Sequence, residues 1–128
     1  MQRKNSLVQT APFRVPTDDG KVIEEHYGRV ASKDRAFSVA HMIAPPGWSE
    51  PHQNPIFDEI TIVVSGKKRV EIDGDTVDLS AGQSILVRKG ARVRYSNPFS
   101  EKTEYWAVCV PAFGLEDARG ESEPSQRK

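Results

Sequence analysis

The alternation of apolar and polar residues from Val22 onward predicts a protein built from short β-strands. Runs rich in Val, Ile, Phe, Thr and Tyr are separated by Gly, Pro and Asp, and no stretch keeps the 3.6-residue repeat of an amphipathic helix. Asp73-Gly74 marks a hairpin turn, whose two central residues need positive φ. The expected fold class is all-β. The predicted strands cover residues 22–30, 37–44, 57–65, 68–73, 75–79, 84–88, 93–96 and 103–110.

The predicted strand at residues 57–65 has apolar side chains on both of its faces. If Glu59 faces the interior, the opposite face carries Ile60, Ile62 and Val64, because successive side chains on a strand alternate. An exposed row of three β-branched apolar side chains is unfavourable. The N-terminal strand, a symmetry mate or both would therefore cover this row.

Composition indicates one globular domain without a charged binding surface. The 128 residues, of which 37% are hydrophobic, suffice for one core and are too few for two ordinary domains. We expect a single domain with its core at about 20–113 and flexible tails at 1–6 and 116–128. Lys plus Arg and Asp plus Glu both number 18, which argues against nucleic-acid and membrane partners.

Targeting signals and disulfides are not expected either. The single cysteine, Cys109, excludes an intrachain disulfide and is expected to be a buried small side chain. No apolar run has the character of a signal peptide or the length of a membrane span. A cytoplasmic location is the default expectation.

The segment from Gly47 to Gly66 places a histidine, a second polar residue and a glutamate at metal-ligand spacing. His52 opens the run, Asn54 follows two residues later, and Glu59 lies five residues beyond. Residues two apart on a strand point the same way, so His52 and Asn54 are expected to converge on one point while Glu59 approaches from the next strand.

This segment resembles the first motif of the cupin family, which reads G, about five residues, H-x-H, three or four residues, E, six residues, G. The second cupin motif, G, five residues, P-x-G, two residues, H, three residues, N, has its counterpart between Gly82 and Asn97. The resemblance covers roughly residues 37–110. It implies a double-stranded β-helix, a jelly-roll β-barrel with an open mouth. It also implies a homodimer that pairs back to back over the apolar row.

The two motifs keep the cupin spacing but change two of the four expected metal ligands. Asn54 stands where the second histidine is expected, and Val93 stands in place of the third. His52 and Glu59, with a carbonyl oxygen from Asn54, remain as candidate ligands for Mn, Fe, Ni or Zn. The alternative roles are hydrogen bonding at the barrel mouth for His52 and substrate contact for Asn54.

Other side chains are expected around the same cavity. Tyr95 shares a strand face with Val93, so its phenol is a candidate catalytic group beside Glu59 and His52. Trp48 is a candidate for stacking on a ligand at the barrel mouth. Tyr105 and His41 are candidate substrate contacts, although His41 is equally well read as a hydrogen-bonded core histidine.

Two functional hypotheses follow from the resemblance. In the first, the barrel binds a small polar metabolite and acts on it as an isomerase, lyase or dioxygenase, with a divalent metal or with Glu59 or His52 as acid or base. In the second, the altered ligands mark a non-catalytic metabolite-binding or sensory cupin. A purely structural dimerisation module is disfavoured, because Glu59 would then be a buried charge without a use.

Overall fold

The computed structural model describes residues 5–114, which form nine β-strands and no helix. The all-β prediction is confirmed, and within the described residues no helix is long and apolar enough to cross a membrane. The predicted tail at 116–128 lies outside the described residues. The strands are β1 (Phe13–Arg14), β2 (Val22–Tyr27), β3 (Ser38–Ala44), β4 (Asp58–Ser65), β5 (Lys67–Ile72), β6 (Asp75–Ser80), β7 (Ser84–Val87), β8 (Val93–Ser96) and β9 (Thr103–Val110).

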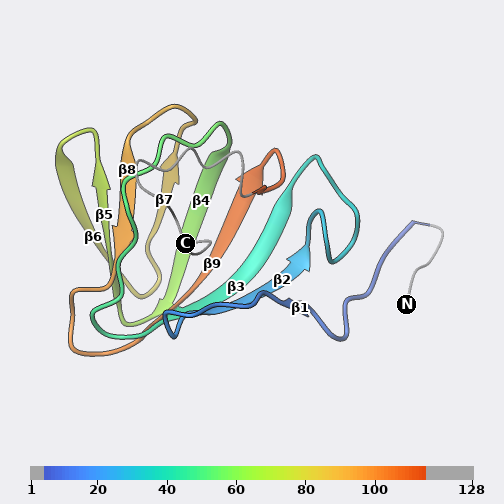
Figure 1. Cartoon of the computed structure of the whole chain (residues 1–128), viewed down its shortest axis with the longest axis horizontal. Helices are drawn as coiled ribbons and strands as arrows, with labels where there is room; N and C mark the ends of the chain where they lie inside the picture. The colour runs from blue at the N-terminus through green and yellow to red at the C-terminus, as the bar shows by residue number, and fades with distance from the viewer. Residues whose placement is uncertain (1–4, 115–128) are drawn as a thin grey trace.

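The strands form two antiparallel sheets. The larger sheet has six strands in the order β1-β2-β3-β9-β4-β7, and the smaller has three in the order β6-β5-β8. Figure 1 shows the small sheet beside the β4 and β7 side of the large one, with β2 and β1 at the opposite side. Every second side chain of β3 and β9 is buried, so the core lies against one face of the large sheet.

The alternation on β4 agrees with the sequence-based expectation. Glu59 faces the interior with 2% of its surface exposed, whereas Ile60, Ile62 and Val64 are 37%, 43% and 46% exposed. The outer face of the large sheet therefore carries an apolar row that the described chain does not bury.

The turn between β5 and β6 is the hairpin that Asp73-Gly74 predicts. Asp73 has φ 47° and Gly74 has φ 90°, as a two-residue turn that matches the strand twist requires. Beside it, the Arg69 guanidinium donates hydrogen bonds of 2.9 and 3.1 Å to the carboxylate of Asp78. This hydrogen bonding lowers the pKa of Asp78 below its ordinary value. Both side chains are solvent-exposed, so the pair contributes little to stability.

Asn97 joins the segments that carry the two sequence motifs. Its side-chain amide donates to the carbonyls of Ala44 and Pro45, each at 3.2 Å, and to that of Glu101 at 2.8 Å. Its backbone N–H donates to the carbonyl of Trp48 at 2.7 Å. The side chain is fully buried, so these bonds satisfy donors that would otherwise destabilise the core. Asn97 thereby holds the loop that enters the candidate site.

Candidate functional site

Two rows of small or polar side chains cross the inner face of the large sheet. The rows are buried in the interior, where Glu59 and Thr61 supply polar atoms. Thr61 is fully buried, and its hydroxyl makes no hydrogen bond to any described residue. Across β3, β9 and β4 the register places Ala40, Ala107 and Thr61 opposite one another in one row, and Ser38, Cys109 and Glu59 in the next.

Four charged side chains are buried within residues 5–114. Lys21, Glu59 and Lys68 are each 2% exposed, and Glu50 is 6% exposed. The two positive and two negative charges balance, and each of the four side chains has an interaction partner. Buried charges are tolerated only when they are paired, so this balance is a requirement of the fold.

The two buried ammonium groups lie against aromatic rings. Lys68 Nζ is 3.3 Å from the centre of the Tyr105 ring and 4.4 Å from that of Tyr95. Lys21 Nζ is 3.9 Å from the centre of the Trp48 ring and 5.3 Å from that of Tyr105. These distances are typical of cation–π contacts. Tyr105 therefore lies within reach of both ammonium groups.

Trp48 is held inside the protein and is not exposed at the mouth of the barrel. Its indole N–H donates to Asp19 Oδ2 at 2.7 Å, and Asp19 Oδ1 accepts from the backbone N–H of Lys21 at 3.1 Å. Only 5% of Trp48 is exposed. The ring that we expected to stack on a ligand contacts the Lys21 ammonium.

The first motif has the opposite orientation from the one expected. Gln53, between the two predicted ligands, is 2% exposed. Its backbone exchanges hydrogen bonds of 2.9 and 2.8 Å with Val93. Directly opposed residues of an antiparallel pair point to the same side, so Gln53 shares the interior face of Val93. His52 and Asn54 are partly exposed, and His52 lines a separate surface cleft with Glu71 and Asp73.

The remaining predicted site residues divide between the two faces. Val93, Tyr95 and Tyr105 are fully buried. His41 lies on the outer face, because the neighbouring residues of β3 occupy the inner one. Its Nε2 is 2.7 Å from a carboxylate oxygen of Glu104, and its Nδ1 is 3.3 Å from one of Glu24. His41 is therefore hydrogen-bonded, as one of the two expectations had it, but it lies on the outer face and not in the core or the cavity.

The side chains inside the protein do not fit a transition-metal site. No group of three or more His, Cys, Asp or Glu in residues 5–114 is arranged to hold a metal ion. Of the three predicted ligands, only Glu59 is buried, and His52 and Asn54 are turned away from it. Among the described residues the two buried carboxylates are matched in number by two buried ammonium groups, so the interior has no excess negative charge to attract a metal cation.

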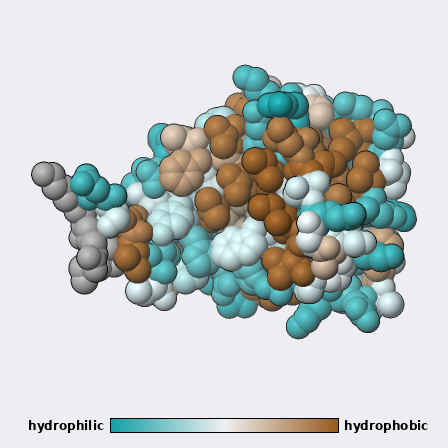
Figure 2. Space-filling view, turned by 180° about the vertical axis from the view of Figure 1, so that it is seen from behind, coloured by the Kyte–Doolittle hydropathy of each residue, from teal (hydrophilic) through white to brown (hydrophobic). Residues whose placement is uncertain are grey.

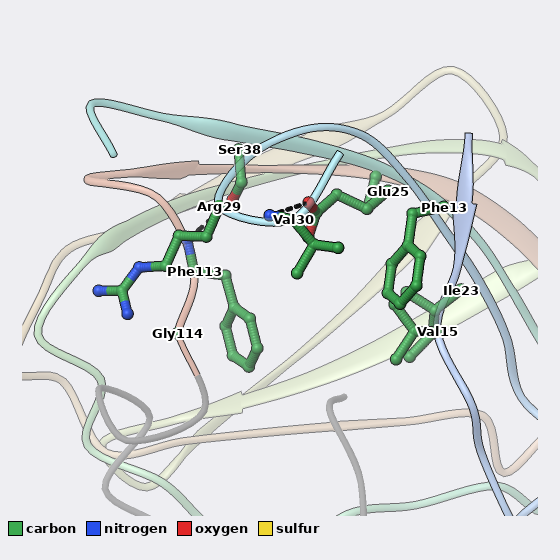
Figure 3. Close-up of a pocket in the computed structure, with 10 residues that line it drawn as sticks. Phe13, Val15, Ile23, Glu25, Arg29, Val30, Ser38, Phe113 and Gly114 are labelled. Carbon is green, nitrogen blue, oxygen red and sulfur yellow. Dashed lines mark hydrogen bonds between the residues drawn. The ribbon is translucent and has the colours of Figure 1, made fainter. Parts of the chain in front are cut away.

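A cleft of about 270 Å³ opens beside the same inner face (Figure 3). Its lining includes Ser38 and Ala40, the first members of the two rows. Adjacent strands are about 4.8 Å apart, so Glu59, two strands from Ser38, lies roughly 10 Å across the sheet from the cleft. The other lining residues are Phe13, Val15, Ile23, Glu25, Arg29, Val30, Phe113 and Gly114.

Phe113 is fixed in the wall of this cleft. Its backbone N–H donates to the Ser38 hydroxyl at 2.9 Å, and its ring meets that of Phe57 edge to face at 5.6 Å. The two sequence motifs do not reveal the cleft, because its walls come from segments outside both of them. The available sequence signals were an aromatic residue three positions after the last predicted strand and the shared face of Ile23 and Glu25.

Comparison with known proteins gives both a family and a relative. Residues 40–111 match the Cupin_2 family, described as a cupin domain. A Myxococcus xanthus protein named endoribonuclease YbeY is 46% identical over 108 residues, which cover 84% of this chain. The chain spans only 37% of the length of that relative.

Two solved structures illustrate the likeness in fold. Streptomyces PAC13, solved with uridine, superposes with a TM-score of 0.73 at 19% identity, covering 94% of this chain and 92% of that chain. The Cupin_2 domain of an XRE family transcriptional regulator from Enterobacter cloacae superposes with a TM-score of 0.60 at 19% identity, covering 70% and 95%. The sequence match over residues 40–111 and the shared barrel architecture together show that the chain belongs to the cupin family.

Proposed function

We propose that this cupin binds a small metabolite in the cleft beside Ser38 and Ala40, and that binding needs no divalent metal. The observation that carries the proposal is that Ser38 and Ala40, which line the cleft, are the first members of the two inner rows that end at Thr61 and Glu59. A ligand whose apolar part packs against Phe113 would direct a polar group along these rows. Clefts with apolar walls and a few convergent polar groups are the usual form of small-molecule sites.

The metal-dependent version of the function has weaker support. It would use His52, Glu59 and Asn54 to hold Mn, Fe, Ni or Zn, yet only Glu59 is directed to the interior. We therefore favour chemistry or recognition by the chain's own side chains. In a catalytic version, Glu59 would act as the base, with Tyr95 or Tyr105 as its proton partner.

The non-catalytic, sensory version is favoured by the relatives. The matched segment forms 37% of the Myxococcus protein named as an endoribonuclease, and the Enterobacter domain belongs to a transcriptional regulator. In both, a segment similar to this chain is one part of a protein named for another role. Ligand binding without turnover is the function we infer for this domain.

A titration with small ring-containing metabolites, followed by amide NMR, tests this proposal. Binders are expected to shift the backbone amides of Val30, Ala40 and Phe113, with equal affinity in the presence of EDTA. Phe113→Ala removes an apolar wall and should weaken binding about tenfold. Phe99→Ala, which removes a ring that does not line the cleft, is the matched control.

Two other outcomes of this titration would change the conclusion. Shifts that appear only without EDTA and spread from Glu59 would support the metal-dependent version instead. Loss of the ligand's own NMR signals over hours, with new signals in their place, would establish turnover. Turnover that Glu59→Gln abolishes would assign the base.

We also propose that the outer face of the large sheet forms a homodimer. Figure 2 shows apolar side chains gathered on the side of the molecule that is turned away from the viewer in Figure 1. A patch of this kind on a soluble protein usually marks an interface. Its members on β4, β7 and β9 include Ile60, Ile62, Val64, Leu86 and Val110, all at least 37% exposed.

Ile62→Lys is expected to convert the dimer to a monomer. Ile62 lies in the middle of the row on β4, so its replacement would bury a lysine without a partner in the interface. Light scattering after size-exclusion chromatography measures the change in mass. Thr76→Lys, on exposed β6, adds the same charge outside the patch and should leave the mass unchanged. A monomeric wild-type protein at micromolar concentration would contradict this proposal.

A further inference from the structure

One carboxylate in the cleft is held in place by the backbone around it. Glu25 Oε2 accepts hydrogen bonds from the backbone N–H groups of Val30 at 3.0 Å and Ala31 at 2.7 Å. Gly28 allows this close approach, since a Cβ at that position would lie 3.0 Å from Glu25 Cδ. The loop after β2 thus fixes the carboxylate in one orientation, which avoids an entropic cost when a ligand binds.

The other oxygen of Glu25 remains available to a ligand. Within the described residues Oε1 makes no hydrogen bond, whereas Oε2 makes both bonds to the loop. Glu25 lines the cleft and is only partly exposed. A carboxylate oxygen in such a position accepts strong hydrogen bonds from cationic donors.

The rest of the cleft is apolar around this carboxylate. Figure 3 shows the rings of Phe13 and Phe113 on opposite sides, with Val30 and Glu25 between them. The side chain of Arg29 extends away from Glu25. Its guanidinium lies against Gly114, where an added Cβ would be only 2.5 Å from an arginine nitrogen. The charge that faces the centre of the cleft is therefore negative.

We propose that Glu25 makes this cleft selective for a small amphipathic amine. An apolar ring or branched chain would pack between Phe13 and Phe113, and an ammonium or amidinium group would donate to Glu25 Oε1. This inference rests on the proposed function, because it names the ligand class of the same cleft. A carboxylate ligand placed in the same way would meet Glu25 with like charge.

Benzylamine and phenylacetate test the inference, because they share a benzyl group and differ in the sign of their charge. In amide NMR titrations, benzylamine is expected to shift Val30 and Ala31 of the full chain and to bind at least tenfold more tightly than phenylacetate. Glu25→Gln should weaken benzylamine binding by about 10- to 100-fold. The glutamine side chain keeps an acceptor oxygen for the two loop N–H groups. Unchanged amide signals of Val30 and Ala31 in the ligand-free variant would therefore confirm an intact loop.

Glu24→Gln is the matched control for charge. Glu24 is adjacent in sequence but contacts His41 on the outer face, so this variant should bind benzylamine as the wild type does. Equal affinities for phenylacetate and benzylamine would overturn the role of Glu25. An unchanged benzylamine affinity in Glu25→Gln would overturn it too. Neither result contradicts the proposal that the cleft binds a ligand. Failure of benzylamine to shift any cleft amide also overturns the role of Glu25. The metabolite titration then decides separately whether the cleft binds another class of ligand.

Discussion

Lys68→Met is expected to lower the free energy of unfolding by about 3–5 kcal/mol. Lys68 is one of the two cations that balance Glu50 and Glu59 in the interior, so its loss leaves an uncompensated buried carboxylate. Methionine has a similar length and packs well against aromatic rings, which keeps the contacts with Tyr95 and Tyr105 filled. The loss of stability therefore reports the loss of charge and not a cavity.

Urea unfolding at a constant m-value measures this effect. Lys67→Met is the matched control, because Lys67 is the exposed neighbour on the same strand, and its replacement should change stability by less than about 0.5 kcal/mol. Adding Glu59→Gln to Lys68→Met should restore part of the stability, with a coupling energy of about 1 kcal/mol or more. Wild-type stability in Lys68→Met would show that the interior carboxylates do not depend on this lysine.

Gly66→Ala is expected to cost about 3 kcal/mol or more. Gly66 connects β4 to β5 with φ +78°, a left-handed conformation that costs roughly 1–2 kcal/mol for a residue with a Cβ. The added Cβ would also lie 2.4 Å from the carbonyl oxygen of Lys102 and 3.1 Å from Thr103 Cα. Both are backbone atoms, so the clash can be relieved only by moving the turn away from β9.

Gly82→Ala separates the clash from the backbone conformation. Gly82 has φ +85°, and no heavy atom lies within 4 Å of a Cβ built there. Its replacement should therefore cost only the conformational part, about 1–2 kcal/mol. Thermal and urea unfolding of the two variants give the difference. Equal losses in the two variants would show that the Lys102 contact relaxes freely.

Much of the fold could be predicted because strand alternation is a local property. Side chains on one continuous strand alternate between its two faces. Because Glu59 faces inward, Ile60, Ile62 and Val64 face outward. The Asp73-Gly74 turn was predictable for a similar reason, since its chemistry resides in two adjacent residues. Motif spacing predicted the cupin fold over roughly residues 37–110, and the family match over residues 40–111 confirms it.

The orientation of His52 could not be predicted from spacing alone. Ser49 lies opposite Ser96, and Gln53 lies opposite Val93, so four residue-to-residue steps on one side span the same distance as three on the other. One extra residue in an antiparallel pairing reverses which side chains face the interior. Motif spacing counts residues but does not reveal such an irregularity. Gln53 therefore faces the interior, where the spacing led us to expect His52 and Asn54.

The cleft depends entirely on contacts between distant parts of the chain. Phe13, Glu25 and Phe113 are brought together because β1 and β2 pair beside β3, and because the chain after β9 returns over Ser38. None of these residues belongs to either sequence motif. Pairing over long sequence separations is a property of the folded sheet and not of any segment.

The sequence by itself determined eight of the nine described strands, the buried face of β4, the hairpin turn and the family. These features depend on side-chain alternation and turn chemistry within a few residues. The tertiary structure decided which polar groups meet inside the protein. Lysines are almost never fully buried, yet Lys21 and Lys68 are both buried against the rings of Trp48, Tyr95 and Tyr105. Burial of a charge depends on partners that only the folded chain supplies, and the same holds for the cleft that Glu25 and Phe113 share.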